Sequence, residues 1–266
     1  MERKELLKLA IQAAFNAGDE ILAIYKSDFT IEKKEDKTPL TQADKNAHSA
    51  ILKILNKTQL PILSEEGKQI DYETRRNWKQ FWMVDPLDGT REFIKRNGEF
   101  TVNIALIEDG NSNLGVVYVP VTSELYFADT TIGAFKIVLH QFSVETIDEL
   151  IKKAQKLPSI HNRKNYIVVG SRSHMNEETE AFMKDVKSKY AEVDLISKGS
   201  SLKLCMVAEG SADCYPRFAP TMEWDTAAGQ AIVIASEGIV MDWNTKQQMK
   251  YNKENLLNSW FLVERN

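Results

Sequence analysis

The sequence predicts an α/β protein built of layered helices and sheets. Apolar residues recur at helical spacing over residues 7–25, which is typical of a long amphipathic helix. Short apolar runs with the composition of strands follow, and segments with helical spacing separate several of them. Two of these runs end directly at an acidic residue, Glu65 and Asp85. The pattern therefore predicts a candidate site at the ends of strands.

Composition and charge limit the classes of protein to consider. The 266 residues allow one large domain or two closely packed halves, and 43% hydrophobic residues suffice for a substantial core. The net charge is 34 − 38 = −4, so non-specific binding to nucleic acid or to an anionic membrane is not expected. Cys205 and Cys214 form no Cys-x-x-Cys pair, which argues against a disulfide scaffold or zinc site and fits a reducing cytoplasm. We expect no signal peptide, because no apolar h-region follows the charged start of the chain. We expect no transmembrane segment, because no apolar run approaches about 20 residues.

Spacing and helix breakers place the elements of the first half. The charged segment 31–39 is expected to be a loop, and Thr41 to open a second helix. Thr41 and Asp44 resemble a capping box with Asp in place of Glu, and capping is the ordinary role for Asp44. The pair Asp109-Gly110 between two apolar runs predicts a hairpin. Strands are expected at 61–64, 81–84, 100–107, 114–119, 125–128 and 134–138.

One hexapeptide, Asp-Pro-Leu-Asp-Gly-Thr, begins at Asp85 and directly follows a buried apolar strand. The strand is expected to stop there, because Pro86 cannot donate a hydrogen bond to a sheet. Two carboxylates then lie within one turn of chain, and Gly89 lets the backbone approach a ligand. Thr90 adds a hydroxyl and begins a predicted helix whose free amides suit an anion. The alternative is ordinary turn formation by the Asp-Pro and Asp-Gly pairs.

The second half begins where the composition turns polar. We place the boundary between an N-terminal half, 1–139, and a C-terminal half, 140–266. Asn176 is expected to cap one helix and Gly210 to end another. Asp225 stands where an N-cap of the next helix would be, and capping and metal binding are equally good explanations for it. Further strands are expected at 167–169, 194–196, 212–215, 239–241 and 260–263.

Acidic side chains thus lie at the ends of three separate elements, at Glu65, at Asp85 with Asp88, and at Asp225. If the strands that end at Glu65 and Asp85 are neighbours, their carboxylates repel, and divalent cations are required to hold them ionised. Such hard oxygen ligands suit Mg²⁺. The sequence offers no nucleophilic triad, no Gly-x-Ser-x-Gly elbow and no Walker loop. What remains is hydrolysis of a phosphate monoester assisted by two ions about 3.5–4 Å apart.

The motifs resemble the lithium-sensitive inositol monophosphatase superfamily. The resemblance rests on Glu65, on the hexapeptide that begins at Asp85, and on the run Trp-Asp-Thr-Ala-Ala-Gly that begins at Trp224. It implies a layered α-β-α-β-α sandwich of the inositol monophosphatase and sugar phosphatase type, with the active site between the two halves. Three further segments make the chain most similar to the 3′(2′),5′-bisphosphate nucleotidase branch: 41–44, 89–93 and 170–174.

The resemblance implies two Mg²⁺ ions. Glu65, Asp85 and the carbonyl of Leu87 would bind the first ion, and Asp85, Asp88 and Asp225 would bind the second. Asp85 would bridge both, so its loss is expected to be the most damaging. Four of these ligands, Glu65, Leu87, Asp88 and Asp225, would also contact the bound substrate.

The implied catalytic residues are Asp44, Thr90 and Glu65. The amides of Gly89 and Thr90 would hold the phosphate. Thr90 paired with Asp44 would orient and deprotonate the attacking water, an assistance worth about 10²–10⁴-fold. A third ion near residues 35–36 is left open.

The implied substrate contacts in the second half are His174, Gly199, Lys203 and Arg217. Cations at three of these places suit a substrate with a second phosphate, and Gly199 would allow close approach. Each cation also has a simpler explanation. His174 would be a polar residue at a helix start, Lys203 a solvated helix residue, and Arg217 a partner in a surface ion pair.

These inferences lead to one expected activity and two rivals. The expected activity is Mg²⁺-dependent removal of the 3′-phosphate from adenosine 3′,5′-bisphosphate, and also from its 5′-phosphosulfate relative, in sulfate assimilation. The rivals are an inositol or fructose-bisphosphate phosphatase, and a non-catalytic regulator that binds metal and phosphate. The resemblance also implies lithium sensitivity, a monomer or homodimer, and a cytoplasmic location. Some relatives lie peripherally on the cytoplasmic side of the inner membrane, and only the resemblance suggests this location here.

Overall fold

The computed structural model describes residues 1–27, 31–33, 39–143, 146–160, 163–170 and 176–265. Its α-helices are α1 Arg3–Tyr25, α2 Gln42–Leu55, α3 Tyr72–Arg75, α4 Thr90–Ile94, α5 Ile147–Lys153, α6 Glu177–Lys189, α7 Leu202–Glu209 and α8 Glu223–Ala235. One 3₁₀ turn, η1 Asn56–Thr58, follows α2.

Two large sheets carry most of the strands. The first sheet has the order β3-β4-β5-β6-β7-β8-β9, and the second has the order β11-β10-β12-β14-β13. The strands of the first sheet are β3 Ile62–Ser64, β4 Gln80–Asp88, β5 Thr101–Glu108, β6 Asn111–Val119, β7 Glu124–Asp129, β8 Gly133–Val138 and β9 Gln155–Lys156. Those of the second are β10 Tyr166–Gly170, β11 Val193–Ser197, β12 Cys214–Arg217, β13 Gly238–Asp242 and β14 Phe261–Arg265. A separate pair joins β1 Ile31–Lys33 and β2 Pro39–Thr41.

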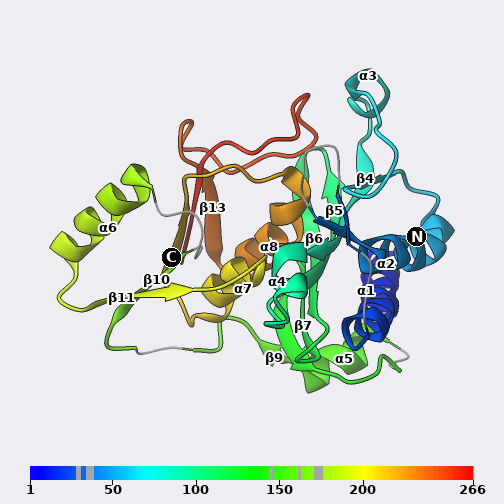
Figure 1. Cartoon of the computed structure of the whole chain (residues 1–266), viewed down its shortest axis with the longest axis horizontal. Helices are drawn as coiled ribbons and strands as arrows, with labels where there is room; N and C mark the ends of the chain where they lie inside the picture. Colours follow the sequence, from blue (N-terminus) through cyan, green and yellow to red (C-terminus); the bar gives the residue numbers. More distant parts are fainter. Residues whose placement is uncertain (28–30, 34–38, 144–145, 161–162, 171–175, 266) are drawn as a thin grey trace.

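Helices and sheets alternate in five layers, as expected (Figure 1). Helices α1 and α2 cover one face of the first sheet, with α1 against β5, β6 and β7 and α2 against β4. Helix α8 packs on β4 to β8 of the first sheet and on β13 of the second, with α7 beside it. Helix α6 lies on the outer face of the second sheet, where it contacts β12. The α-β-α-β-α sandwich is therefore confirmed.

Helix α8 lies so close to the first sheet because β6 has a glycine beneath it. A Cβ atom built on Gly115 would lie 2.2 Å from the carbonyl oxygen of Ala228 and 2.9 Å from the Cβ of Ala231. Any side chain at this position would push the helix outward. The glycine thus fixes the height at which α8, and the residues of its first turn, sit over the sheet.

Several local predictions are confirmed. The Asp109-Gly110 pair joins β5 to β6 with positive φ at both residues, as a tight hairpin turn requires. Asn176 caps α6 by accepting the Thr179 amide at 3.0 Å. Gly210 ends α7 with φ +91°.

Several predicted boundaries are wrong. Residues 31–33 and 39–41 form the antiparallel pair β1 and β2 and not a loop, so Thr41 ends a strand and α2 begins at Gln42. Strand β4 does not stop at Asp85 but continues to Asp88, because its pairing with β5 shifts between these residues and the irregular stretch accommodates Pro86. Helix α8 begins at Glu223, so Asp225 is its third residue and not its N-cap.

The division of the chain at residues 139 and 140 stays a prediction. Strand β9 pairs with β8, so the first sheet includes chain beyond that point. None of the described helices combines the length and the apolar character that a membrane crossing requires.

Candidate active site

Two neighbouring strands bring the first acids together. Strands β3 and β4 are parallel, with Ser64 opposite Val84. The residues that follow this pair are Glu65, directly after β3, and Asp85, within β4. They are therefore adjacent, and the Glu65 amide donates to the Val84 carbonyl at 3.1 Å. The sequence-based expectation that these strands are neighbours is confirmed.

Asp85 lies at the centre of an acidic group. Its side chain is buried, and burial raises its pKa well above the usual value. Repulsion from Glu65, Asp88, Asp225 and Asp44 raises the pKa further, in that order. The four acids come from the end of β3, the end of β4, the first turn of α8 and the first turn of α2. The fold thus brings all the predicted acidic residues within electrostatic range of one carboxylate.

Asp225, on α8, is also surrounded by acidic side chains. Burial raises its pKa well above normal, and the charge of Asp88 is the next contribution. Its Oδ2 accepts the amide of Met222 at 2.8 Å, so the carboxylate caps the helix by reaching back three residues. The structure therefore combines the two explanations that the sequence left open, a helix-start role and a place among the acids.

Asp88 is held from two directions. Its Oδ2 accepts the hydroxyl of Ser201 at 2.8 Å and the side-chain amide of Asn103 at 3.3 Å. Ser201 also lies 2.8 Å from the backbone carbonyl of Asp225. Asp85 in turn accepts the Leu87 amide at 3.1 Å through Oδ1.

The turn after β4 presents backbone amides and a hydroxyl. Gly89 adopts φ +93° ahead of α4, which begins at Thr90 as predicted. A Cβ on Gly89 would lie 3.2 Å from the Glu99 carbonyl oxygen and 3.3 Å from the Cβ of Ser200, so the position requires glycine for both reasons. The Thr90 hydroxyl donates to the Leu87 carbonyl at 3.4 Å, which is a long hydrogen bond. Its pairing with Asp44 stays a prediction.

The donor set fits a hard divalent cation. Only carboxylates and a backbone carbonyl are offered, which suits Mg²⁺. A cation would also offset the repulsion that raises the pKa of Asp85 and Asp225. Among the residues that the structure describes, no group of three or more His, Cys, Asp and Glu side chains is arranged to hold an ion as it stands. The metal assignments therefore remain proposals.

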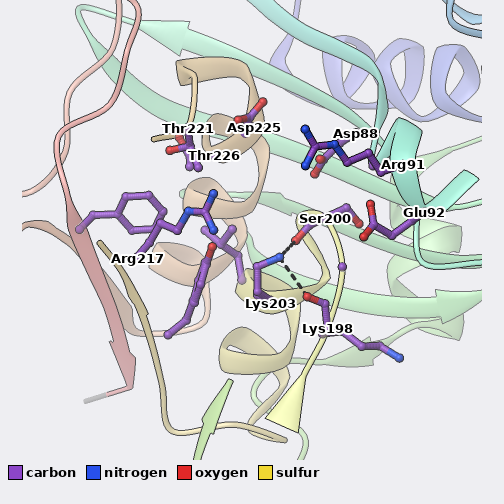
Figure 2. A pocket seen from close by; sticks show the side chains of 15 residues that line it. Asp88, Arg91, Glu92, Lys198, Ser200, Lys203, Arg217, Thr221, Asp225 and Thr226 are labelled. Carbon is purple, nitrogen blue, oxygen red and sulfur yellow. Dashed lines mark hydrogen bonds between the residues drawn. The ribbon is translucent and has the colours of Figure 1, made fainter. Parts of the chain in front are cut away.

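A cavity of about 150 Å³ opens beside Asp88 and Asp225. Figure 2 shows Arg217 and Lys203 pointing into it from the second half, opposite Asp88 and Arg91 of the first. The side that presents Lys203 and Arg217 is thus the basic wall of the cavity, and the opposite side carries the carboxylate of Asp88 together with the cation Arg91.

Lys203 is buried and not a solvated helix residue. Its Nζ donates to the carbonyl oxygens of Ser200 at 2.6 Å and Lys198 at 3.3 Å. Burial lowers its pKa to about 8, although the charge of Asp88 acts in the opposite direction. The ammonium also lies over the ring of Tyr215, 5.4 Å from its centroid.

Arg217 is the last residue of β12 and is 9% exposed. Its Nη2 donates to the Pro220 carbonyl at 3.0 Å. Its buried Nε makes no hydrogen bond within the described part of the chain. Burying an N–H donor without an acceptor costs free energy. An anionic ligand in the cavity would supply the acceptor that Arg217 Nε lacks.

The loop before α7 is fastened to the first half. The Gly199 amide donates to Glu99 Oε2 at 2.9 Å, and a Cβ on Gly199 would lie 2.8 Å from both the Glu92 Cγ and the Glu99 carbonyl. Gly199 therefore permits contact between the halves as well as lining the cavity. Two predictions, His174 and the third ion near residues 35–36, fall outside the described residues.

The sequence-based reasoning missed Ser201, Asn103 and Glu99. Ser201 stands at the start of a helix, where serine normally signals a cap. Asn103 is the one polar side chain between Val102 and Ile107 on an otherwise apolar strand, and a buried polar residue there was the available signal.

The chain matches known proteins over nearly its whole length. The model of the inositol monophosphatase family matches residues 2–264. The 3′(2′),5′-bisphosphate nucleotidase CysQ of Salmonella typhimurium is 42% identical over 262 residues, 97% of this chain and 99% of that protein. CysQ of Escherichia coli K12 is 41% identical with the same coverage.

Solved structures show the same likeness. The crystal structure of CysQ from Bacteroides thetaiotaomicron, a bacterial member of the inositol monophosphatase family, superposes with a TM-score of 0.92 at 50% identity. It covers 99% of this chain and 98% of that chain. The Thermotoga maritima IMPase superposes with a TM-score of 0.72 at 22% identity over 98% of this chain and 92% of that one, and shows the shared fold alone.

Proposed function

Because this chain belongs to the inositol monophosphatase family, we propose that it is a Mg²⁺-dependent 3′(2′),5′-bisphosphate nucleotidase. It hydrolyses the 3′-phosphate of adenosine 3′,5′-bisphosphate to give AMP and phosphate, and acts on the 5′-phosphosulfate relative in the same way. Its physiological role is removal of the by-product of sulfate activation.

One observation carries the proposal. The acidic group around Asp85 adjoins a cavity whose opposite wall presents Lys203 and Arg217. A phosphate monoester with a second anionic group needs both features, acids to hold cations at one end and fixed cations at the other. An inositol monophosphate has no second phosphate to use the basic wall.

The acids would hold two ions. Glu65, Asp85 and the Leu87 carbonyl are assigned to one ion, and Asp85, Asp88 and Asp225 to the other. When bound, these ions polarise the phosphoryl oxygens and make the attacking water more acidic. Asp85 would serve both ions, and it is the most buried of the group.

Thr90 and Asp44 handle the proton of the reaction. The Thr90 hydroxyl accepts a hydrogen bond from the attacking water, and Asp44 receives the proton through it. The water oxygen forms a bond to phosphorus, and the bond from phosphorus to the ribose 3′-oxygen breaks. That oxygen takes up a proton from solvent water to become the 3′-hydroxyl, and Asp44 returns its proton to solvent. The amides of Gly89 and Thr90 bind the phosphate oxygens and keep the phosphorus in line.

The second half recognises the nucleotide. Lys203 and Arg217 bind the 5′-phosphate, and the unpaired Nε of Arg217 gains its acceptor there. Lys203 is already fixed by the carbonyls of Ser200 and Lys198, so little side-chain freedom is lost on binding. His174 is assigned to the nucleotide by resemblance.

Phosphate release from a substrate panel tests the proposal. The panel contains adenosine 3′,5′-bisphosphate, its 5′-phosphosulfate, inositol 1-phosphate and fructose 1,6-bisphosphate, each with Mg²⁺ and with a chelator. We expect the bisphosphate nucleotide to give the highest kcat/KM and the chelator to abolish release. A higher kcat/KM for inositol 1-phosphate would overturn the nucleotide assignment, and binding without any release would favour a regulator.

A further inference from the structure

A buried series of hydrogen-bonded polar side chains ends at Asp88. The Thr101 hydroxyl donates to Asn103 Oδ1 at 3.0 Å, and Asn103 Nδ2 donates to the Ser201 hydroxyl at 2.8 Å. Ser201 then lies 2.8 Å from Asp88 Oδ2. Thr101, Asn103 and Ser201 are each at most 1% exposed, so water does not compete for these contacts.

The geometry gives the series a direction. A serine hydroxyl has one proton and can also accept. Since the Ser201 oxygen accepts from Asn103, its proton is directed to Asp88 Oδ2 or to the backbone carbonyl of Asp225, both at 2.8 Å. The second proton of the Asn103 amide points to the same Asp88 oxygen at 3.3 Å.

Ser201 departs from the usual behaviour of a serine at this place. It is the N-cap residue of α7, where a serine side chain normally accepts an amide of its own helix and contributes about 1 kcal/mol. Here its backbone is helical and it makes no such cap bond. The side chain instead faces Asp88, so local helix stability is given up for a contact between the two halves.

We propose that Ser201 and Asn103 are positioning residues that hold Asp88 by Oδ2 and so present its Oδ1 to the cation it shares with Asp225. In the described part of the chain, no donor contacts Oδ1 of Asp88. Ser201 touches both the carboxylate of Asp88, on β4, and the backbone of Asp225, on α8. It therefore sets the separation of two ligands from different elements. The proposal rests on the proposed function for the identity of the cation.

Metal binding, measured without turnover, tests the proposal. Mn²⁺ has a spectroscopic signal and accepts the same oxygen ligands, so free Mn²⁺ is titrated by electron paramagnetic resonance with and without inorganic phosphate. We expect Ser201→Ala to weaken Mn²⁺ binding by about 10–100-fold, the usual effect of removing a residue that orients a metal ligand. In activity, the Mg²⁺ concentration for half-maximal rate should rise by a similar factor, while kcat at saturating Mg²⁺ stays near the wild-type value.

Ser112 provides a matched control. It is also 1% exposed, and its hydroxyl donates to the α8 carbonyl of Ala227 at 2.6 Å, but it touches none of the acids. Ser112→Ala should lower the melting temperature as much as Ser201→Ala and leave Mn²⁺ binding unchanged. Equal Mn²⁺ affinity in Ser201→Ala and wild type would overturn the proposal.

A second variant, Asn103→Ala, tests the proposal independently in case Ser201→Ala does not fold. Asn103→Ala removes a donor to the same Asp88 oxygen, and we expect it to weaken Mn²⁺ binding as well. Because both residues act through Oδ2, the double variant should lose less than the product of the two single losses. If the losses of Mn²⁺ affinity in the two single variants instead multiply in the double variant, the two residues do not act through the same Asp88 oxygen. If wild-type protein binds Mn²⁺ in this pattern but releases no phosphate, the proposed function fails and the positioning role stands.

Discussion

Glu99 accepts a hydrogen bond from the backbone amide of Gly199 at 2.9 Å, although the two residues are 100 positions apart in the chain. Glu99 Oε1 also lies 3.3 Å from the Nζ of Lys198. The Ser200 hydroxyl donates to the Glu99 carbonyl at 2.9 Å. One residue of the first half therefore anchors the whole loop that leads to Lys203.

Loss of this anchor should weaken nucleotide binding. We expect Glu99→Ala to raise KM for adenosine 3′,5′-bisphosphate by roughly 3–10-fold, the value of one or two hydrogen bonds. Glu99→Gln keeps an acceptor for the Gly199 amide and should have a smaller effect. Steady-state kinetics check this, and an unchanged KM in Glu99→Ala would show that the loop is held without it.

Asp85→Asn should separate activity from stability. The variant removes one charge from a buried group of like charges, so in a chelator its melting temperature should equal or exceed that of wild type. Mg²⁺ should raise the melting temperature of wild type only, because a bound ligand stabilises by about 2.7 kcal/mol at 100 times its Kd. Phosphate release should fall to background. Substantial release by this variant would refute the assignment of Asp85.

Lys203 should give nucleotide binding a pH dependence. Burial lowers its pKa to about 8, so the ammonium becomes a neutral amine as pH rises through that value. We expect kcat/KM for the bisphosphate nucleotide to fall across this range, and much less so for a small aryl phosphate that does not reach the basic wall. The pH profile of kcat/KM reports the free enzyme and is the measurement required.

Lys203→Ala should lower kcat/KM for the nucleotide by about 10–100-fold, as expected for a lost charge-assisted contact. Lys246→Ala, which removes an ammonium stacked on Trp243 outside the cavity, is the control. Equal losses on nucleotide and aryl phosphate would exclude Lys203 from the substrate site.

Gly115→Ala should destabilise the fold. Its Cβ would lie 2.2 Å from the Ala228 carbonyl oxygen, so α8 must move outward, at a cost of about 1–3 kcal/mol. At Gly170 the nearest atom to a new Cβ is Leu195 Cδ1 at 3.5 Å, an ordinary contact. Gly170→Ala should therefore be neutral or slightly stabilising. Urea unfolding compares the two, and equal stabilities would show that α8 can shift freely.

Arg3 should stabilise the first sheet in a pH-dependent way. Burial alone would raise the pKa of Asp129, but hydrogen bonds from Arg3 and Thr131 outweigh it and lower the pKa. A carboxyl group whose pKa is lowered in the folded state stabilises the fold at pH values above its unfolded-state pKa. This contribution is lost as the pH falls through the folded-state pKa. We expect Arg3→Ala to cost about 1 kcal/mol at pH 7, discounted because the Arg3 side chain is 32% exposed, and less at pH 3. Lys4→Ala, which breaks an exposed pair with Asp148, should cost less than about 0.5 kcal/mol at either pH.

Local chemistry made much of the fold predictable. The hairpin at Asp109-Gly110 and the caps at Asn176 and Gly210 depend on a few adjacent residues, and each was identified from the sequence. The end of β4 was not, because a register shift against β5 lets Pro86 sit where it breaks no regular ladder. That shift depends on a partner strand that the local sequence does not reveal.

In the candidate site, too, some features could be predicted from the sequence and others could not. Carboxylates at strand ends are visible in sequence, and the parallel pairing of β3 and β4 brings Glu65 to Asp85 as expected. The burial of Lys203 and the turn of Ser201 away from its own helix result from packing between the two sheets. Such tertiary contacts join residues about 100 positions apart, and no periodicity encodes them.

The location of Asp225 on α8 has a consequence for biosynthesis. During translation, the ribosome completes the first sheet about 70 residues before it reaches Asp225. Helix α8 can pack on the sheet only afterwards, and strands β13 and β14 emerge after it. A nascent chain therefore carries an incomplete set of acids until Asp225 has been made, and we expect hydrolytic competence to arise abruptly, only after α8 and the strands that follow it are in place.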